Sequence, residues 1–136
     1  MASEKIEEIE GIGPAYAERL RASGCAHANT LLERGCSKKG REELCEESRI
    51  SEKQILRWVN FADLLRIDGI GPEYAELLEA SGVDSVPELA QRDAAYLTER
   101  CAETNAVRTL TRKIPTGAQV ENWIKQAIEL GHKIEY

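Results

Sequence analysis

Apolar positions recur at helical spacing in two segments of the chain, residues 51–65 and residues 116–130. Each segment places aliphatic and tryptophan side chains three or four residues apart, which predicts a helix with one apolar face. These positions are Ile55, Trp58, Val59, Ala62 and Leu65 in the first segment and Val120, Trp123, Ile124, Ala127 and Leu130 in the second. We therefore expect both tryptophans to lie in the core. Ser51 with Gln54, and Thr116 with Gln119, fit the capping box that starts a helix.

The two segments belong to a longer internal repeat. The stretch from Ile9 to Gly24 returns from Ile67 to Gly82 at an offset of 58 residues, whereas the tryptophan segments are offset by 65. The second copy therefore carries extra residues, which we place within residues 103–115. Two repeated segments that occur in the same order predict a duplicated unit, with residues 1–65 as the first copy and residues 66–136 as the second.

Each copy contains a Gly-Ile-Gly-Pro turn followed by a helix. Gly11 suits a positive φ, Ile12 suits an inward position, and Pro14 suits the first position of a helix. That helix is predicted over residues 14–23 and ends at Gly24. The counterparts in the second copy are Gly69, Ile70, Pro72, residues 72–81 and Gly82.

Composition and charge narrow the fold and function classes. Aromatic residues are only 5% of the chain, so the core must be built from Leu, Ile, Val and Ala, and with abundant Glu, Lys and Arg this predicts an all-α fold. Asp and Glu number 24 against 18 Lys and Arg, and the net charge of -6 is opposite to that typical of nucleic-acid-binding proteins. No apolar run approaches the roughly 20 residues that cross a bilayer, and no signal peptide is present, so we expect a cytoplasmic protein without a membrane partner.

Cysteine and histidine positions predict no metal site. Cys25, His27, Cys36 and Cys45 form a superficial ligand set, but they lack the paired spacing typical of zinc modules. Cys25 also aligns with the apolar Val83 of the second copy, which favours reduced thiols that serve as small apolar residues. Neither histidine has a matching nucleophile or carboxylate nearby in the sequence. We therefore expect no metal, no cofactor and no enzymatic activity.

The two turns, each followed by Ala and Leu at helical spacing, resemble the helix-hairpin-helix motif of DNA repair and replication proteins. The matching positions are Ala17 and Leu20 in the first copy and Ala75 and Leu78 in the second. Over nearly all of its length, the chain is also similar to an uncharacterised bacterial family of tandem helix-hairpin-helix repeats. The resemblance implies two pseudo-symmetric units, each a SAM-domain-like helical bundle. It also implies a second, degenerate hairpin near residues 48–51 and near residues 114–117.

In the general role of this motif, backbone N–H groups of the hairpin hold a nucleic-acid phosphate without reading the bases. The resemblance places that contact at Gly11, Ile12 and Gly13. The basic side chains that we expect to support it are Arg19, Arg21, Lys38, Lys39 and Arg41. Where a cation often follows the turn, this chain has Ala15 in the first copy and Glu73 in the second. We therefore expect the first turn to be the better phosphate site.

Two function classes remain open at this point. The first, which we favour, is a non-catalytic module that binds the phosphate backbone of DNA independently of its sequence. The second is a protein–protein interaction or scaffolding module that kept the fold but lost phosphate binding. The acidic charge, Ala15 and Glu73 favour this second class. The sequence does not indicate an oligomeric state.

Overall fold

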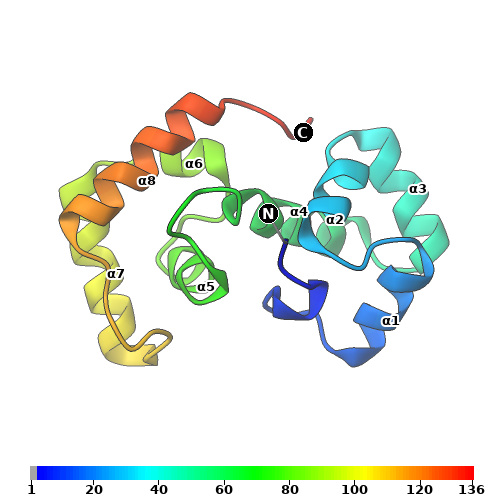
Figure 1. Ribbon diagram of the computed structural model, residues 1–136, viewed down its shortest axis with the longest axis horizontal. Helices are drawn as coiled ribbons and strands as arrows, with labels where there is room; N and C mark the ends of the chain where they lie inside the picture. Colours follow the sequence, from blue (N-terminus) through cyan, green and yellow to red (C-terminus); the bar gives the residue numbers. More distant parts are fainter. Residues whose placement is uncertain (1–2) are drawn as a thin grey trace. The chain divides into compact units, whose positions relative to one another are not determined.

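The computed structural model describes residues 3–136, and over this range the secondary structure is helical. In chain order the elements are η1 (Ile6–Glu8), α1 (Pro14–Ala22), α2 (Ala28–Gly35), α3 (Lys38–Ser48), α4 (Glu52–Leu64), α5 (Pro72–Ala80), α6 (Val86–Ala90), α7 (Ala94–Arg108) and α8 (Gly117–Leu130) (Figure 1). The described residues form no strand, only an isolated bridge between Lys5 and His27. The predicted all-α fold is confirmed.

The chain divides into two compact units. Unit 1 comprises Met1–Asp63 together with Lys133–Tyr136, and unit 2 comprises Leu64–His132. The sequence repeat had placed residues 66–136 together in one copy. In the structure the last four of these residues pack with unit 1 instead, because they make specific contacts to α2 and α3 that the repeat pattern does not encode.

Each unit has one tryptophan at its centre. Trp58 of α4 and Trp123 of α8 are both 2% exposed, which confirms the predicted core role. The ring of Tyr16 packs edge-on against Trp58 with 5.2 Å between centroids, and the Tyr74 and Trp123 rings are 5.1 Å apart. Such pairs stabilise a core beyond the apolar area that they bury. The same aromatic contact therefore anchors α1 to α4 and α5 to α8.

The first glycine of each turn is required by both backbone conformation and space. Gly11 has a φ of +93° and Gly69 a φ of +97°, a region that residues with a Cβ rarely adopt. A Cβ on Gly11 would lie 3.2 Å from the indole nitrogen of Trp58, and a Cβ on Gly69 would lie 2.9 Å from that of Trp123. The tight turn thus lets the backbone approach the central tryptophan of its unit.

The helix starts follow the sequence pattern. The Ser51 hydroxyl accepts the N–H of Gln54 at 3.3 Å, and Thr116 and Gln119 form both bonds of a capping box. Pro14 and Pro72 open α1 and α5 as predicted. These interactions are local, so they could be inferred from residues three or four positions apart.

All four cysteines are free thiols, and we predict that they differ in reactivity. Burial raises the pKa of the Cys25, Cys45 and Cys101 thiols. Cys25 and Cys101 are buried, whereas Cys36 and Cys45 are half-buried. Because the thiolate is the reactive form, iodoacetamide at about pH 8 should label Cys36 first. Mass spectrometry of the folded chain would check the order. Labelling of Cys25 or Cys101 as fast as Cys36 would contradict it, and all four should react equally in denaturant.

Candidate functional site

The start of α1 is an exposed helix N-terminus without a side-chain cap. Gly13 is the N-cap residue in extended conformation, Pro14 follows it, and residues 13–15 are exposed. A Cβ built on Gly13 would meet no atom within 4 Å. The N–H groups of the first turn have no acceptor within the helix, and the helix dipole adds partial positive charge there. This end of α1 is open to an anion.

A side-chain hydrogen bond links the first turn of α4 to the first turn of α1. The Gln54 side-chain amide, in the first turn of α4, donates a hydrogen bond to the hydroxyl of Tyr16, in the first turn of α1, at 3.3 Å. We call residues 11–15 and residues 49–53 together the paired helix starts. Both segments are short connections that enter a helix, and the ring contact of Tyr16 with Trp58 joins the two helices that they enter.

The paired helix starts include two cations that sequence reasoning missed. Arg49 ends α3 with a left-handed φ of +59° and is exposed, Ile50 is buried, and Ser51 caps α4. Lys53 is exposed in the first turn of α4. The degenerate hairpin that we expect near residues 48–51 overlaps this segment of the chain. Arginine rarely adopts a positive φ, so its residue type does not predict the left-handed conformation of Arg49.

The carboxylates that precede α1 are engaged by other groups. Arg21 forms an ion pair with Glu7, and the guanidinium of Arg57 lies 2.8 Å from the carboxylate of Glu10. The carboxylate of Glu8 accepts a backbone N–H at 3.1 Å. These contacts reduce the negative potential that an approaching phosphate would meet. They also mean that Arg21, a predicted site residue, balances a carboxylate at the surface.

The other predicted basic residues divide between the two ends of unit 1. Arg19 is exposed on α1, with its guanidinium 5.7 Å from the centre of the Tyr16 ring. Lys38 and Lys39 are exposed at the start of α3, whose far end leads into the α4 start. An 11-residue helix spans roughly 15 Å, so these two lysines stand that far from the paired helix starts. In Figure 1 the α2–α3 connection and the turn before α1 lie at opposite ends of unit 1.

Arg41 does not lie on an exposed basic surface, which corrects the expectation from the sequence. Its side chain is 1% exposed, and its guanidinium donates to the carbonyl oxygen of Gly35 at 2.9 Å and to that of Glu135. Arg41 precedes the buried Leu44 by one helical turn and shares its inward face of α3. A phosphate at the surface cannot reach a guanidinium enclosed in this way.

The corresponding start of α5 in unit 2 is less suited to an anion. Gly71 is also an N-cap residue without side-chain support, and a Cβ there would meet no atom within 4 Å. Glu73, however, places an exposed carboxylate in the first turn. The Tyr74 hydroxyl donates to the backbone oxygen of Lys113 at 3.0 Å, so the inserted residues 110–115 lie against this helix start. The paired helix starts hold one exposed carboxylate, Glu52, against the two cations Arg49 and Lys53, so charge and space both favour the unit 1 site.

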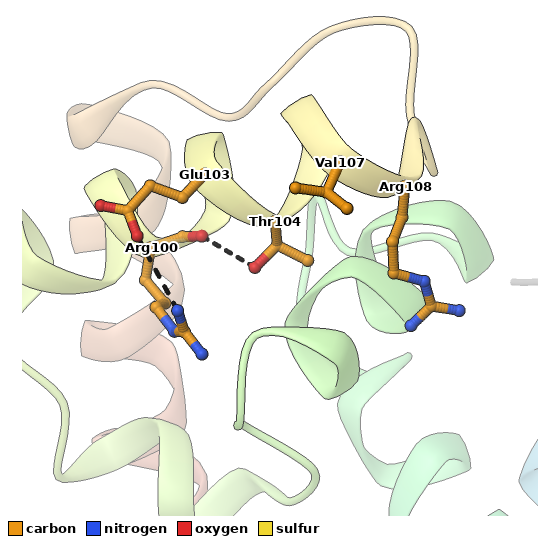
Figure 2. A pocket seen from close by; sticks show the side chains of 5 residues that line it. All are labelled: Arg100, Glu103, Thr104, Val107 and Arg108. Atoms are coloured by element: carbon orange, nitrogen blue, oxygen red, sulfur yellow. Dashed lines mark hydrogen bonds and ion pairs between the residues drawn. The ribbon is translucent and has the colours of Figure 1, made fainter.

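A second surface feature lies on α7. Side chains on one face of this helix line an open pocket of about 350 Å³: Arg100, Glu103, Thr104, Val107 and Arg108 (Figure 2). Val107 is 85% exposed, and Arg100 and Glu103 are within 3.8 Å of each other. Val107 is thus an exposed apolar side chain between charges of both signs.

Neither metal chemistry nor membrane insertion is supported by a structural feature of the described residues. Within residues 3–136 no three His, Cys, Asp or Glu side chains gather in a way that could hold a metal ion. None of the helices in the same range combines the length and the apolar character needed to cross a bilayer.

Comparison with known proteins identifies a family for this chain but no activity. Residues 10–130 match the family model described as "Domain of unknown function (DUF4332)". No curated protein and no solved structure shows a significant match. A function must therefore be argued from the geometry and charge of the residues themselves.

Proposed function

The chain belongs to the DUF4332 family, whose function is unknown, and we propose that it is a non-catalytic module that holds the phosphate backbone of DNA. The contact is made at the paired helix starts of unit 1. The observation that carries the proposal is the exposed, uncapped N-terminus of α1, whose first turn is linked through Tyr16 to Gln54 in the first turn of α4, the turn that carries Lys53. Phosphate contacts carry no base information, so the binding is independent of sequence.

Three further features support the proposal. The turn at Gly11 resembles the helix-hairpin-helix motif, in which backbone N–H groups hold a phosphate. The open space around Gly13 lets an oxygen approach the first N–H groups of α1. The carboxylates before α1 are already engaged, and unit 1 is the less acidic unit, with 11 Lys and Arg against 13 Asp and Glu.

Lys53→Gln is expected to weaken DNA binding several-fold and to lower the salt dependence by about one phosphate contact. The reason is that Lys53 stands in the first turn of α4, beside the proposed phosphate position. Fluorescence anisotropy of labelled single- and double-stranded DNA at about 50 and 200 mM salt measures both effects. Wild-type binding should fall steeply between the two salt concentrations.

Lys39→Gln is the matched control for this experiment. It removes the same charge from an exposed position at the start of α3, at the far end of that helix. Its affinity should stay close to that of the wild type. Equal losses in both variants would show only a general effect of charge, and no binding by the folded wild type at low salt would overturn the proposal.

Binding of a protein partner is the second candidate function, and the α7 surface favours it. Val107→Glu would place a charge at the most exposed apolar side chain of the pocket without disturbing the core. In cross-linking with cell extract, we expect the wild type to capture a partner that Val107→Glu does not. If both proteins capture the same set, this surface is not the interface. A DNA-binding result leaves this test independent, because α7 lies in unit 2.

A further inference from the structure

The segment Lys133–Tyr136 is held against unit 1 by contacts from each of its four residues. The ammonium of Lys133 lies 2.8 Å from the carboxylate of Glu33, and Ile134 is only 5% exposed. Tyr136 donates its hydroxyl to the side-chain oxygen of Asn60 at 2.5 Å. We call these four residues the 133–136 segment. Because they follow α8 of unit 2, their place on unit 1 is set by these contacts and not by chain neighbours.

The central residue of the segment, Glu135, is recognised through both its main chain and its side chain. Its N–H donates to the carbonyl oxygen of Cys36 at 2.7 Å, and its own carbonyl oxygen accepts from the guanidinium of Arg41. Its carboxylate accepts the N–H of Lys38 at 3.2 Å, at the start of α3. In peptide recognition, main-chain hydrogen bonds of this kind provide affinity and buried side chains provide selectivity.

The receiving side of this contact is built around a buried charge. Arg41 is 1% exposed, and it bonds to the carbonyl oxygens of Gly35 and Glu135. Its Nε is buried without a hydrogen-bond partner. A buried guanidinium is stable only where acceptors surround it, and Gly35, the last residue of α2, supplies only one of them. The second acceptor of the Arg41 guanidinium is the carbonyl oxygen of Glu135, in the 133–136 segment.

Unit 2 offers an internal comparison for this arginine. Arg41 is the fourth residue after Ser37, the N-cap of α3, and Leu97 is the fourth residue after Asp93, the N-cap of α7. Leu97 is also 1% exposed. In unit 2, an apolar side chain is therefore sufficient to fill the corresponding buried position. Unit 1 has a hydrogen-bond donor there instead, and it bonds the main chain of the 133–136 segment.

We infer that the α2–α3 junction of unit 1 is an acceptor site for a short non-helical peptide with an aliphatic, an acidic and an aromatic residue in succession. The 133–136 segment occupies the site as an intramolecular ligand. When it is released, a peptide of the same chemistry binds in its place. This inference is independent of the proposed DNA contact, which lies at the opposite end of α3.

The test uses the full chain labelled with ¹⁵N and the variant Ile134→Asp. Loss of the buried aliphatic side chain should release the segment, so that heteronuclear NOE values of residues 133–136 fall to those of a flexible chain. The amide signals of Lys38 and Arg41 should shift at the same time. Adding the peptide Gly-His-Lys-Ile-Glu-Tyr, which corresponds to residues 131–136, should return these signals toward their wild-type positions in a saturable way.

Two comparisons decide what the result means. The same peptide with aspartate in place of isoleucine should leave the signals unchanged. The wild type should need at least about tenfold more peptide, because its own segment competes at high effective concentration. An unchanged NOE in Ile134→Asp, or no shift with millimolar peptide after release, would overturn the inference.

A second variant covers the case in which Ile134→Asp loses its helical circular dichroism. Glu135→Pro removes the N–H that donates to Cys36 and the carboxylate that accepts from Lys38, both at an exposed residue, and the peptide is then added to this variant. Release of the segment followed by saturable peptide binding supports the inference. Unfolding of both variants would overturn it, because the segment would then be a necessary part of the unit 1 core.

Discussion

Gly13→Val is expected to lower DNA affinity at least about tenfold while the protein stays folded, a difference of about 1.4 kcal/mol in binding free energy. Gly13 has an extended backbone with a φ of -83°, and a Cβ there meets no atom within 4 Å. The branched side chain would therefore fit the fold, with at most about 1 kcal/mol lost at the N-cap. It would stand over the first N–H groups of α1, where a phosphate oxygen must approach to about 2.9 Å.

Gly71→Val in unit 2 is the matched control for this variant. Gly71 has the same role at the start of α5, a φ of -93° and the same open space around its Cβ position. Because Glu73 and the residues 110–115 disfavour an anion there, this variant should bind DNA as the wild type does. Anisotropy titrations with both variants at about 50 mM salt, after circular dichroism shows each to be folded, measure the difference. Unchanged binding by Gly13→Val would contradict the proposed site.

Gly40→Ala is expected to destabilise the protein by about 1–3 kcal/mol, although alanine favours a helix over glycine by about 1 kcal/mol. Gly40 lies in the first turn of α3, and a Cβ there would be 2.0 Å from the carbonyl oxygen of Arg34 in α2. Backbone atoms cannot move aside as a flexible side chain can. The methyl group would therefore push α3 away from α2, and packing outweighs helix propensity.

Gly117→Ala provides the opposite expectation in the same protein. Gly117 is the first residue of α8, and the nearest atom to a Cβ there is the Thr98 hydroxyl oxygen at 4.0 Å. With no steric conflict, alanine should stabilise the chain by up to about 1 kcal/mol. Urea denaturation followed by circular dichroism gives both values. An increase in stability for Gly40→Ala would show that the α2–α3 contact is looser than described.

The turns, caps and central tryptophans were predictable because their causes are short in sequence. A positive φ at Gly11, a proline at the first position of α1 and a capping box at Thr116 each depend on neighbours within four residues. The core position of Trp58 follows from one apolar stripe on one helix. The internal repeat adds a second example of most of these features, which separates them from chance.

The candidate site was predictable only in part. The turn before α1 was predicted from its Gly-Ile-Gly-Pro sequence, whereas Arg49 and Lys53 were missed because the link between α4 and α1, the hydrogen bond of Gln54 to Tyr16, joins residues 38 positions apart. Arg41 was assigned to the surface because a run of basic residues looks the same whether one of them points inward or outward. Its burial depends on what packs against α3.

Local hydrogen bonding and apolar periodicity in the chain were thus sufficient for the helical class, the turns and the approximate bounds of α1, α4, α5 and α8. Packing between distant segments decided which charges are exposed, which side chains link α1 to α4, and why residues 133–136 join unit 1. The physical reason is that a residue's own neighbours determine its backbone conformation, whereas its burial and its partners depend on surfaces that form only when separate helices come together.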